Sequence, residues 1–176
     1  VYMVDQGEYI RPEESLRRQP AGKRSMYVNL TNRCTCACTF CLRQLKDMAE
    51  NTSLWLKQEP TVAEVETALQ AAPWAFVSEV VFCGFGEPTM RLTELTELLR
   101  WVREHHPAVH TRVNTNGLSD LAYGRDTAPD FGGGLLDTIS VSLNASNAER
   151  YLELTRSKFG IGSFAAMMDF AVHCKA

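Results

Sequence analysis

Four runs of β-prone, mainly apolar residues alternate along this chain with segments of helical character. The runs cover residues 26–31, 79–83, 110–114 and 137–143. Between the second and third runs, apolar residues recur with the one-face spacing of an amphipathic helix, at Leu95, Leu98, Leu99 and Val102. Strands that alternate with helices are typical of parallel β/α units. The sequence therefore predicts an α/β fold whose four strands form one parallel sheet.

Two capping boxes indicate where helices begin. Thr61 and Glu64 form one box, which opens a helix that ends near Ala72, and Ser146 and Glu149 form the other. Further helices are expected over residues 40–50 and from residue 163 onward, and a loop rich in Gly, Asp and Pro over residues 120–134.

The first part of the chain differs in composition from the rest. Residues 1–25 are polar and read as an N-terminal lead-in, with one short strand around residues 1–4 or 9–10. Residues 26–176 carry the predicted strands and therefore form the core domain.

Four of the six cysteines lie within eight residues. Three of them, Cys34, Cys38 and Cys41, have the spacing C-x-x-x-C-x-x-C, which lets one short loop place three thiolates around a metal cluster. Electron-carrying iron–sulfur clusters are usually held by four cysteines. A cubane cluster on this loop would keep one iron open for a substrate or cofactor.

Other interpretations of the cysteines stay open. A structural zinc site usually has four protein ligands, often two separated C-x-x-C pairs, and no second pair follows here. Zinc or plain thiols are nevertheless alternatives. Cys36 either offers a C-x-C-x-x-C ligand set or is a small residue that points away from the cluster.

Polar motifs follow the next two strands. Gly84 and Gly86 permit a tight turn and close approach of the backbone, and the Glu87 carboxylate accepts hydrogen bonds when ionised. Asn114 and Asn116 both donate and accept. Ordinary turn chemistry is the alternative for these residues, since Asn-Gly is itself a strong turn signal. Because β/α barrels place their chemistry at the carboxyl ends of the strands, we expect a common site there.

Ser140, Ser142 and Asn144 alternate along the last strand and so share one face. They either line the same site or form a polar strand end.

The order of these motifs resembles the radical S-adenosylmethionine (SAM) superfamily. The cysteine loop, with Phe40 before its last cysteine, is followed by Gly-Phe-Gly-Glu-Pro, similar to the family's glycine–glycine–glutamate motif except at Phe85. Asn-Thr-Asn-Gly and Ser-Val-Ser-Leu-Asn resemble the ribose-side motif and the following active-site strand. A closer likeness, carried by residues 29–34, 82–88, 112–117 and 142–149, is to the TatD-associated radical SAM proteins.

The resemblance implies a partial (β/α) barrel, which usually has six strands. Since four are predicted here, this chain either lacks the last strands or is a piece of a longer one. It implies a [4Fe–4S] cluster on Cys34, Cys38 and Cys41. It also implies SAM binding by Phe40, Gly84, Gly86, Glu87, Asn114, Asn116, Ser140, Ser142 and Asn144. An external one-electron donor would reduce the cluster, which cleaves SAM to a 5′-deoxyadenosyl radical that removes hydrogen from a substrate. A glycyl-radical activase and a non-catalytic iron–sulfur or zinc module are the alternatives.

Charge and composition limit the partners. The net charge of −3 does not indicate the excess of positive charge that is typical of nucleic-acid-binding proteins. No long apolar span and no signal peptide are present, so we expect a cytoplasmic protein without membrane contact. The likeness to TatD-associated proteins adds association with a TatD-type nuclease.

Overall fold

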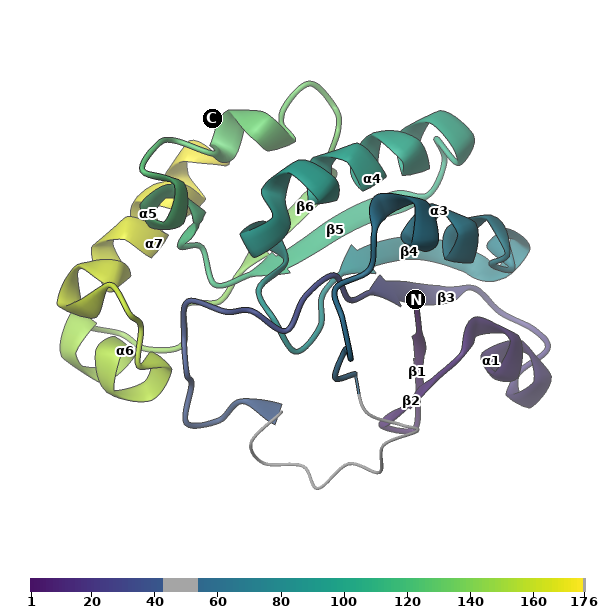
Figure 1. The fold of residues 1–176 in the computed structure, drawn as a ribbon, viewed down its shortest axis with the longest axis horizontal. Coiled ribbons are helices and arrows are strands. Elements are labelled where there is room, and N and C mark those ends of the chain that lie inside the picture. The colour runs from purple at the N-terminus through teal and green to yellow at the C-terminus, as the bar shows by residue number, and fades with distance from the viewer. Residues whose placement is uncertain (43–53, 176) are drawn as a thin grey trace.

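The computed structural model describes residues 1–42 and 54–175. A four-stranded parallel sheet forms the centre of this part of the chain, with the strands in sequence order (Figure 1). These are β3 (Arg24–Val28), β4 (Val77–Phe82), β5 (His110–Thr115) and β6 (Thr138–Val141). Their ends differ by a few residues from the apolar runs of the sequence. The predicted α/β fold with a parallel sheet is confirmed.

Two helices cover one face of the sheet, α3 (Val62–Gln70) and α4 (Leu92–His105). Helices α5 (Ser119–Tyr123), α6 (Ala148–Thr155) and α7 (Ser163–His173) gather together at the β6 end of the molecule (Figure 1). In the part of the chain that is described, no helix has the length and apolar character needed to cross a membrane.

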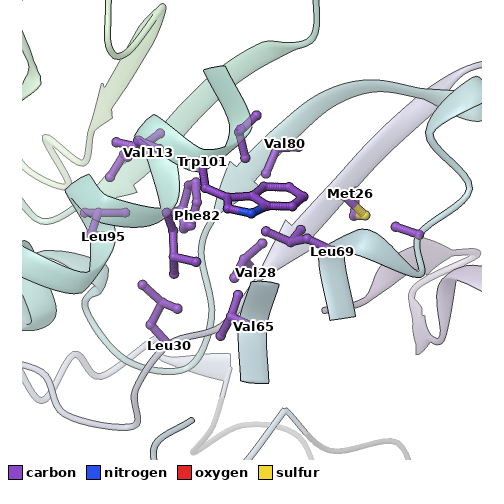
Figure 2. Packing of buried hydrophobic residues seen from close by; sticks show 14 of the residues in the cluster. Met26, Val28, Leu30, Val65, Leu69, Val80, Phe82, Leu95, Trp101 and Val113 are labelled. Carbon is purple, nitrogen blue, oxygen red and sulfur yellow. The ribbon is translucent and has the colours of Figure 1, made fainter. Parts of the chain in front are cut away.

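The main core lies between the sheet and helices α3 and α4. Alternate strand residues point to this side, and Figure 2 shows them packed against side chains from both helices. The residues that meet there include Met26, Val28, Val80, Phe82, Val113, Val65, Leu69, Leu95 and Trp101. The opposite face of the sheet is therefore free to carry polar residues toward the interior of the partial barrel.

The N-terminal segment packs onto the first strand. Strands β1 (Met3–Asp5) and β2 (Glu8–Ile10) form an antiparallel hairpin that contains both positions at which a short strand was expected. Helix α1 (Pro12–Arg18) follows. Tyr2 pairs with Tyr27 of β3 through two main-chain hydrogen bonds of 2.9 and 2.8 Å. The hairpin is a separate two-stranded sheet, and this single antiparallel bridge joins the segment before it to β3.

The first capping box is confirmed and the second is wrong. The Glu64 amide donates to Thr61 Oγ1 at 3.2 Å, and the Thr61 amide donates to the Glu64 carboxylate at 2.7 Å. At α6 the N-cap is Asn147, whose Oδ1 accepts from the Arg150 amide at 2.9 Å. Asparagine and serine are both good N-caps, so adjacent candidates leave the start of a helix uncertain by one residue.

The segment over residues 120–134 is not simply a loop. It holds most of α5, which ends at Gly124 with a left-handed φ of 66°, and a 3-10 helix at Ala128–Phe131. Short helices of this length carry little periodicity, which is why composition alone suggested a loop. The helix expected over residues 40–50 lies mostly outside the described residues.

The capping box provides a first prediction. Thr61→Ala removes the acceptor for the Glu64 amide and is expected to lower the free energy of unfolding by about 1 kcal/mol. Thr67→Ala is the matched control, because Thr67 lies inside α3 and its hydroxyl donates to the Ala63 carbonyl at 2.8 Å. Urea denaturation of both variants measures the difference, and equal effects would contradict a capping role.

Candidate active site

The cysteine loop brings its thiols together after β3. Cys36 is buried, and its thiol is in hydrogen-bonding contact with those of Cys34 and Cys38. Its amide lies 3.4 Å from Cys34 Sγ. These contacts, followed by burial, raise the pKa of the Cys36 thiol above its ordinary value. Cys36 therefore does not point away from the cysteine group.

Cys41 is placed by a turn in the same loop. Its amide donates to the Cys38 carbonyl at 3.1 Å, and its side chain is half-buried. The three cysteines of the C-x-x-x-C-x-x-C spacing therefore lie on one continuous, hydrogen-bonded stretch of backbone.

Helix α6 anchors the cysteine loop. The amides of Ala37 and Thr39 donate to the carbonyls of Thr155 and Leu154, both at 2.9 Å, and the Lys158 amide donates to the Thr35 carbonyl at 3.0 Å. The last carbonyls of a helix have no partner within the helix, so the end of α6 is free to accept these bonds. No local sequence pattern shows this contact, which joins segments more than a hundred residues apart.

The turn after β4 packs against the start of the cysteine loop. A Cβ at Gly86 would lie 2.2 Å from the Thr31 carbonyl oxygen and 2.7 Å from that of Arg33. At Gly84 it would lie 2.1 Å from Asn29 Oδ1. The Glu87 amide also donates to the Arg33 carbonyl at 2.8 Å. The two glycines therefore permit contact between the two segments that any larger residue would obstruct.

Phe85 stands where the superfamily motif has its first glycine. Its side chain is buried and meets the Tyr9 ring of β2 edge-on, with the ring centroids 6.3 Å apart. The backbone at Phe85 does not have a positive φ. The N-terminal hairpin therefore supplies the space that accommodates this departure from the motif.

Glu87 connects this turn to the end of β5. One carboxylate oxygen accepts from the amide and hydroxyl of Thr89, at 3.1 and 2.9 Å, and from the Thr115 hydroxyl at 2.7 Å. The other oxygen accepts from the main-chain amide of Asn116 at 2.7 Å. Burial raises the pKa of Glu87 above its ordinary value, while these hydrogen bonds act in the opposite direction. In the structure, the Glu87 carboxylate binds the main chain of Asn116. Contact between Glu87 and SAM stays a prediction.

Asn116 joins Glu87 to the cysteine loop. Its side-chain amide donates to the Thr35 hydroxyl at 3.0 Å and lies 3.7 Å from both Cys34 Sγ and Cys36 Sγ. Its carbonyl oxygen accepts from the Leu118 amide at 3.0 Å. The structure thus brings together three of the segments that the sequence predicted to share a site.

Asn114 lies on the other face of β5 from the core, paired in register with Ser140 of β6. Its Oδ1 is buried and has no hydrogen-bond partner among the residues that the structure describes.

The remaining predicted residues lie at the surface of the described chain. Ser140, Ser142 and Asn144 are exposed, and so is Phe40, at 43%. Asn144 has a left-handed φ of 58°. Strand β6 ends at Val141, so the predicted alternation does not extend to Ser142 and Asn144. No side-chain hydrogen bond joins these residues to the cysteine loop within the described residues. Their part in SAM binding stays a prediction.

Two residues that the sequence did not single out, Glu59 and Arg91, bind the segment that leads into the cysteine loop. Glu59 accepts from Arg33 Nε at 2.7 Å and from its terminal nitrogen at 3.0 Å, and it also accepts from the Thr31 hydroxyl. The buried Arg91 donates to the carbonyls of Leu30 and Pro60, at 3.1 and 2.6 Å. Charged residues with such roles are recognisable only when their partners are known.

The Glu59 contact provides a pH prediction. The hydrogen bond from Arg33 holds the pKa of Glu59 below its ordinary value, against the effect of burial. A lowered pKa contributes stability above the ordinary glutamate value of about 4.3, which is lost as the pH falls through the folded-state pKa. The difference in unfolding free energy between wild type and Glu59→Gln is therefore expected to be full at neutral pH and to shrink in acid.

Denaturation at a series of pH values measures this difference. Glu97→Gln is the control, because Glu97 is exposed on α4 and has no ion pair within the described part of the chain. A wild-type advantage over Glu59→Gln that stays constant down to pH about 3 would contradict the assignment.

Comparison with known proteins gives a family. A profile of the Radical SAM superfamily matches residues 28–173. The GTP 3′,8-cyclase of Corynebacterium glutamicum (strain R) is 34% identical over 160 residues, which cover 85% of this chain and 38% of the relative. The FeMo cofactor biosynthesis protein NifB of Chlorobaculum tepidum is 32% identical over 107 residues, 58% of this chain and 25% of the relative. The chain thus spans well under half the length of these relatives.

The donor set fits the cofactors of that family, a [4Fe–4S] cluster and SAM. Soft thiolates bind iron–sulfur clusters, as they also bind Zn²⁺ and Cu(I), and one loop presents Cys34, Cys38 and Cys41. The glycine turn and Asn116 lie against this loop at the carboxyl edge of the sheet. The profile match covers every one of these motifs. The chain belongs to the Radical SAM superfamily.

Proposed function

We propose that this chain forms the catalytic core of an enzyme that cleaves SAM reductively and uses the resulting radical to remove hydrogen from a substrate. The observation that carries the proposal is the cysteine loop, fixed between α6 and the Gly86 turn in a chain that matches the superfamily. When bound and reduced, the cluster supplies one electron to SAM, which yields methionine and a 5′-deoxyadenosyl radical.

The residues of the chain hold and orient the reactants. Cys34, Cys38 and Cys41 would hold three irons of the cluster. Glu87 fixes Asn116, whose side-chain amide lies beside the cysteine thiols. Asn114 offers a buried acceptor without a partner on the barrel side of β5, which suits a hydroxyl of a bound nucleoside.

We propose GTP as the first substrate to test, because relatives at about a third identity are named GTP 3′,8-cyclases. The reaction also needs an external one-electron donor. A TatD-type nuclease partner remains a proposal that rests on the sequence resemblance, and a cytoplasmic location also remains a proposal.

The test is SAM cleavage by anaerobically reconstituted protein with dithionite, with 5′-deoxyadenosine measured by chromatography. Cys38→Ala is the control. Cysteine-dependent 5′-deoxyadenosine supports the proposed reaction, and consumption of GTP in the same assay supports GTP as substrate. A full cluster without 5′-deoxyadenosine from the wild-type chain would contradict the catalytic role of this core. 5′-Deoxyadenosine formed with GTP intact would exclude GTP.

A further inference from the structure

Tyr151 of α6 presents a buried hydroxyl that nothing in the described chain satisfies. The residue is fully buried, and its Oη has no hydrogen-bond partner among the described residues. Its ring meets that of Phe164 at a centroid distance of 5.6 Å and an angle of 61°. A polar group that is buried without a partner is unfavourable, so a tyrosine at this position indicates a missing acceptor.

The surroundings of Tyr151 consist largely of the cysteine loop. Tyr151 belongs to the same buried cluster as Cys36, against which the side chains of Cys34 and Cys38 also pack. Burial first, and then the charges of Cys36, Cys38, Glu87 and Cys34, raise the pKa of the Tyr151 hydroxyl. A tyrosine hydroxyl is a hydrogen-bond donor, and this one lies in the same buried cluster as the loop that holds the iron–sulfur cluster.

The backbone fixes this relation. The Tyr151 amide donates to the Asn147 carbonyl at 3.0 Å, and the Thr155 hydroxyl donates to the Tyr151 carbonyl at 2.8 Å. One turn later, the carbonyls of Leu154 and Thr155 accept from the cysteine loop. Helix α6 thus carries Tyr151 and also binds the backbone of the cysteine loop, which fixes the tyrosine relative to the cysteines.

The other neighbours argue against a water as the acceptor. The remaining buried members of the cluster are Leu118 and Met167, which offer no strong hydrogen-bonding group. A buried water needs two to four polar partners, and the side chains of Leu118 and Met167 offer none. Sulfur atoms of a bound cluster would supply the acceptor.

We propose that the Tyr151 hydroxyl donates a hydrogen bond to a sulfur atom of the bound iron–sulfur cluster, a sulfide or a cysteine thiolate. The proposal rests on the cluster that the proposed function requires. Hydrogen bonds to the sulfur atoms help set the reduction potential of such clusters. The reduced cluster carries one more negative charge, so a donated hydrogen bond stabilises it and raises the potential. The Tyr151 hydroxyl thus makes the cluster easier to reduce.

The test compares reconstituted wild type with Tyr151→Phe, which keeps the ring and removes the hydroxyl. Cluster reduction is followed by electron paramagnetic resonance during an anaerobic potentiometric titration. At a fixed potential, the ratio of reduced to oxidised cluster in Tyr151→Phe is expected to be about tenfold lower, a shift of about 59 mV to more negative values for a one-electron couple. Tyr2→Phe is the control, because the Tyr2 hydroxyl donates to the Cys83 carbonyl at 3.1 Å and lies outside the cysteine loop.

A second measurement separates this role from simple packing. In cluster-free protein, Tyr151→Phe is expected to leave the thermal midpoint unchanged or to raise it, because the substitution removes an unsatisfied hydroxyl. Equal potentials and equal spectra for the two proteins would overturn the proposal, whatever the effect on stability. A shifted potential in protein that makes no 5′-deoxyadenosine would contradict the proposed function and leave the hydrogen bond established.

Discussion

Gly86→Ala is expected to lower the free energy of unfolding by about 3 kcal/mol and to displace the cysteine loop. The new Cβ would lie 2.2 Å from the Thr31 carbonyl oxygen and 2.7 Å from that of Arg33. Both are main-chain atoms, so neither moves aside by a change of rotamer. The segment that leads into Cys34 must shift as a whole, and the bond between the Glu87 amide and the Arg33 carbonyl is then lost.

Two other glycines complete a graded comparison, measured by urea denaturation together with iron content after reconstitution. Gly84→Ala meets the Asn29 side chain. Asn29 Oδ1 and Cγ move aside by a change of rotamer, at the loss of the 2.6 Å bond to the Leu54 carbonyl, while Asn29 Cβ, at 2.8 Å, needs a small shift of its backbone. Its effect is expected to be smaller, about 1–2 kcal/mol. Gly162→Ala has open space and an ordinary φ of −65°, so it is expected to be neutral or to stabilise by up to about 1 kcal/mol. Equal effects at all three positions would show that the turn is not tightly packed.

Features set by local patterns were predictable from the sequence. The four strands, the Thr61 capping box and the helix from Ser163 each depend on neighbouring residues, and the structure confirms all of them. The cysteine spacing and the glycine turn are equally local, and their order along the chain sufficed to indicate the family. The error at Ser146 has a local cause too, because the next residue is an equally good N-cap.

Features that depend on distant contacts were not predictable in this way. Nothing near Glu59 indicates that it binds Arg33, and nothing near Leu154 indicates that α6 holds the cysteine loop. Strand alternation assigned Ser140 to a face, but a face does not reveal what covers it. No local sequence pattern singles out Tyr151. Only the absence of a partner for its hydroxyl within the described chain gives it a functional meaning.

Cys38→Ala is expected to remove nearly all bound iron and all 5′-deoxyadenosine formation. Only two thiolates of the C-x-x-x-C-x-x-C set remain in this variant. Even residues that only support metal ligands change metal affinity by roughly 10–100-fold, so loss of a ligand is expected to exceed that range. Iron, sulfide and zinc contents after reconstitution measure the effect, and zinc in the wild-type protein without iron would favour a structural zinc site.

Cys36→Ala is the matched variant, because its thiol contacts the same group yet lies outside the family spacing. It is buried among Leu118, Tyr151 and Met167, so its substitution is expected to lower stability by about 1 kcal/mol and to leave iron content near that of wild type. Cys38 and Cys41 belong to both candidate ligand sets, so Cys34→Ala completes the comparison. Loss of iron from Cys36→Ala with retention in Cys34→Ala would instead assign the ligands to the C-x-C-x-x-C set. Because both side chains leave the same loop two residues apart, the pair separates ligation from packing in one reconstitution experiment.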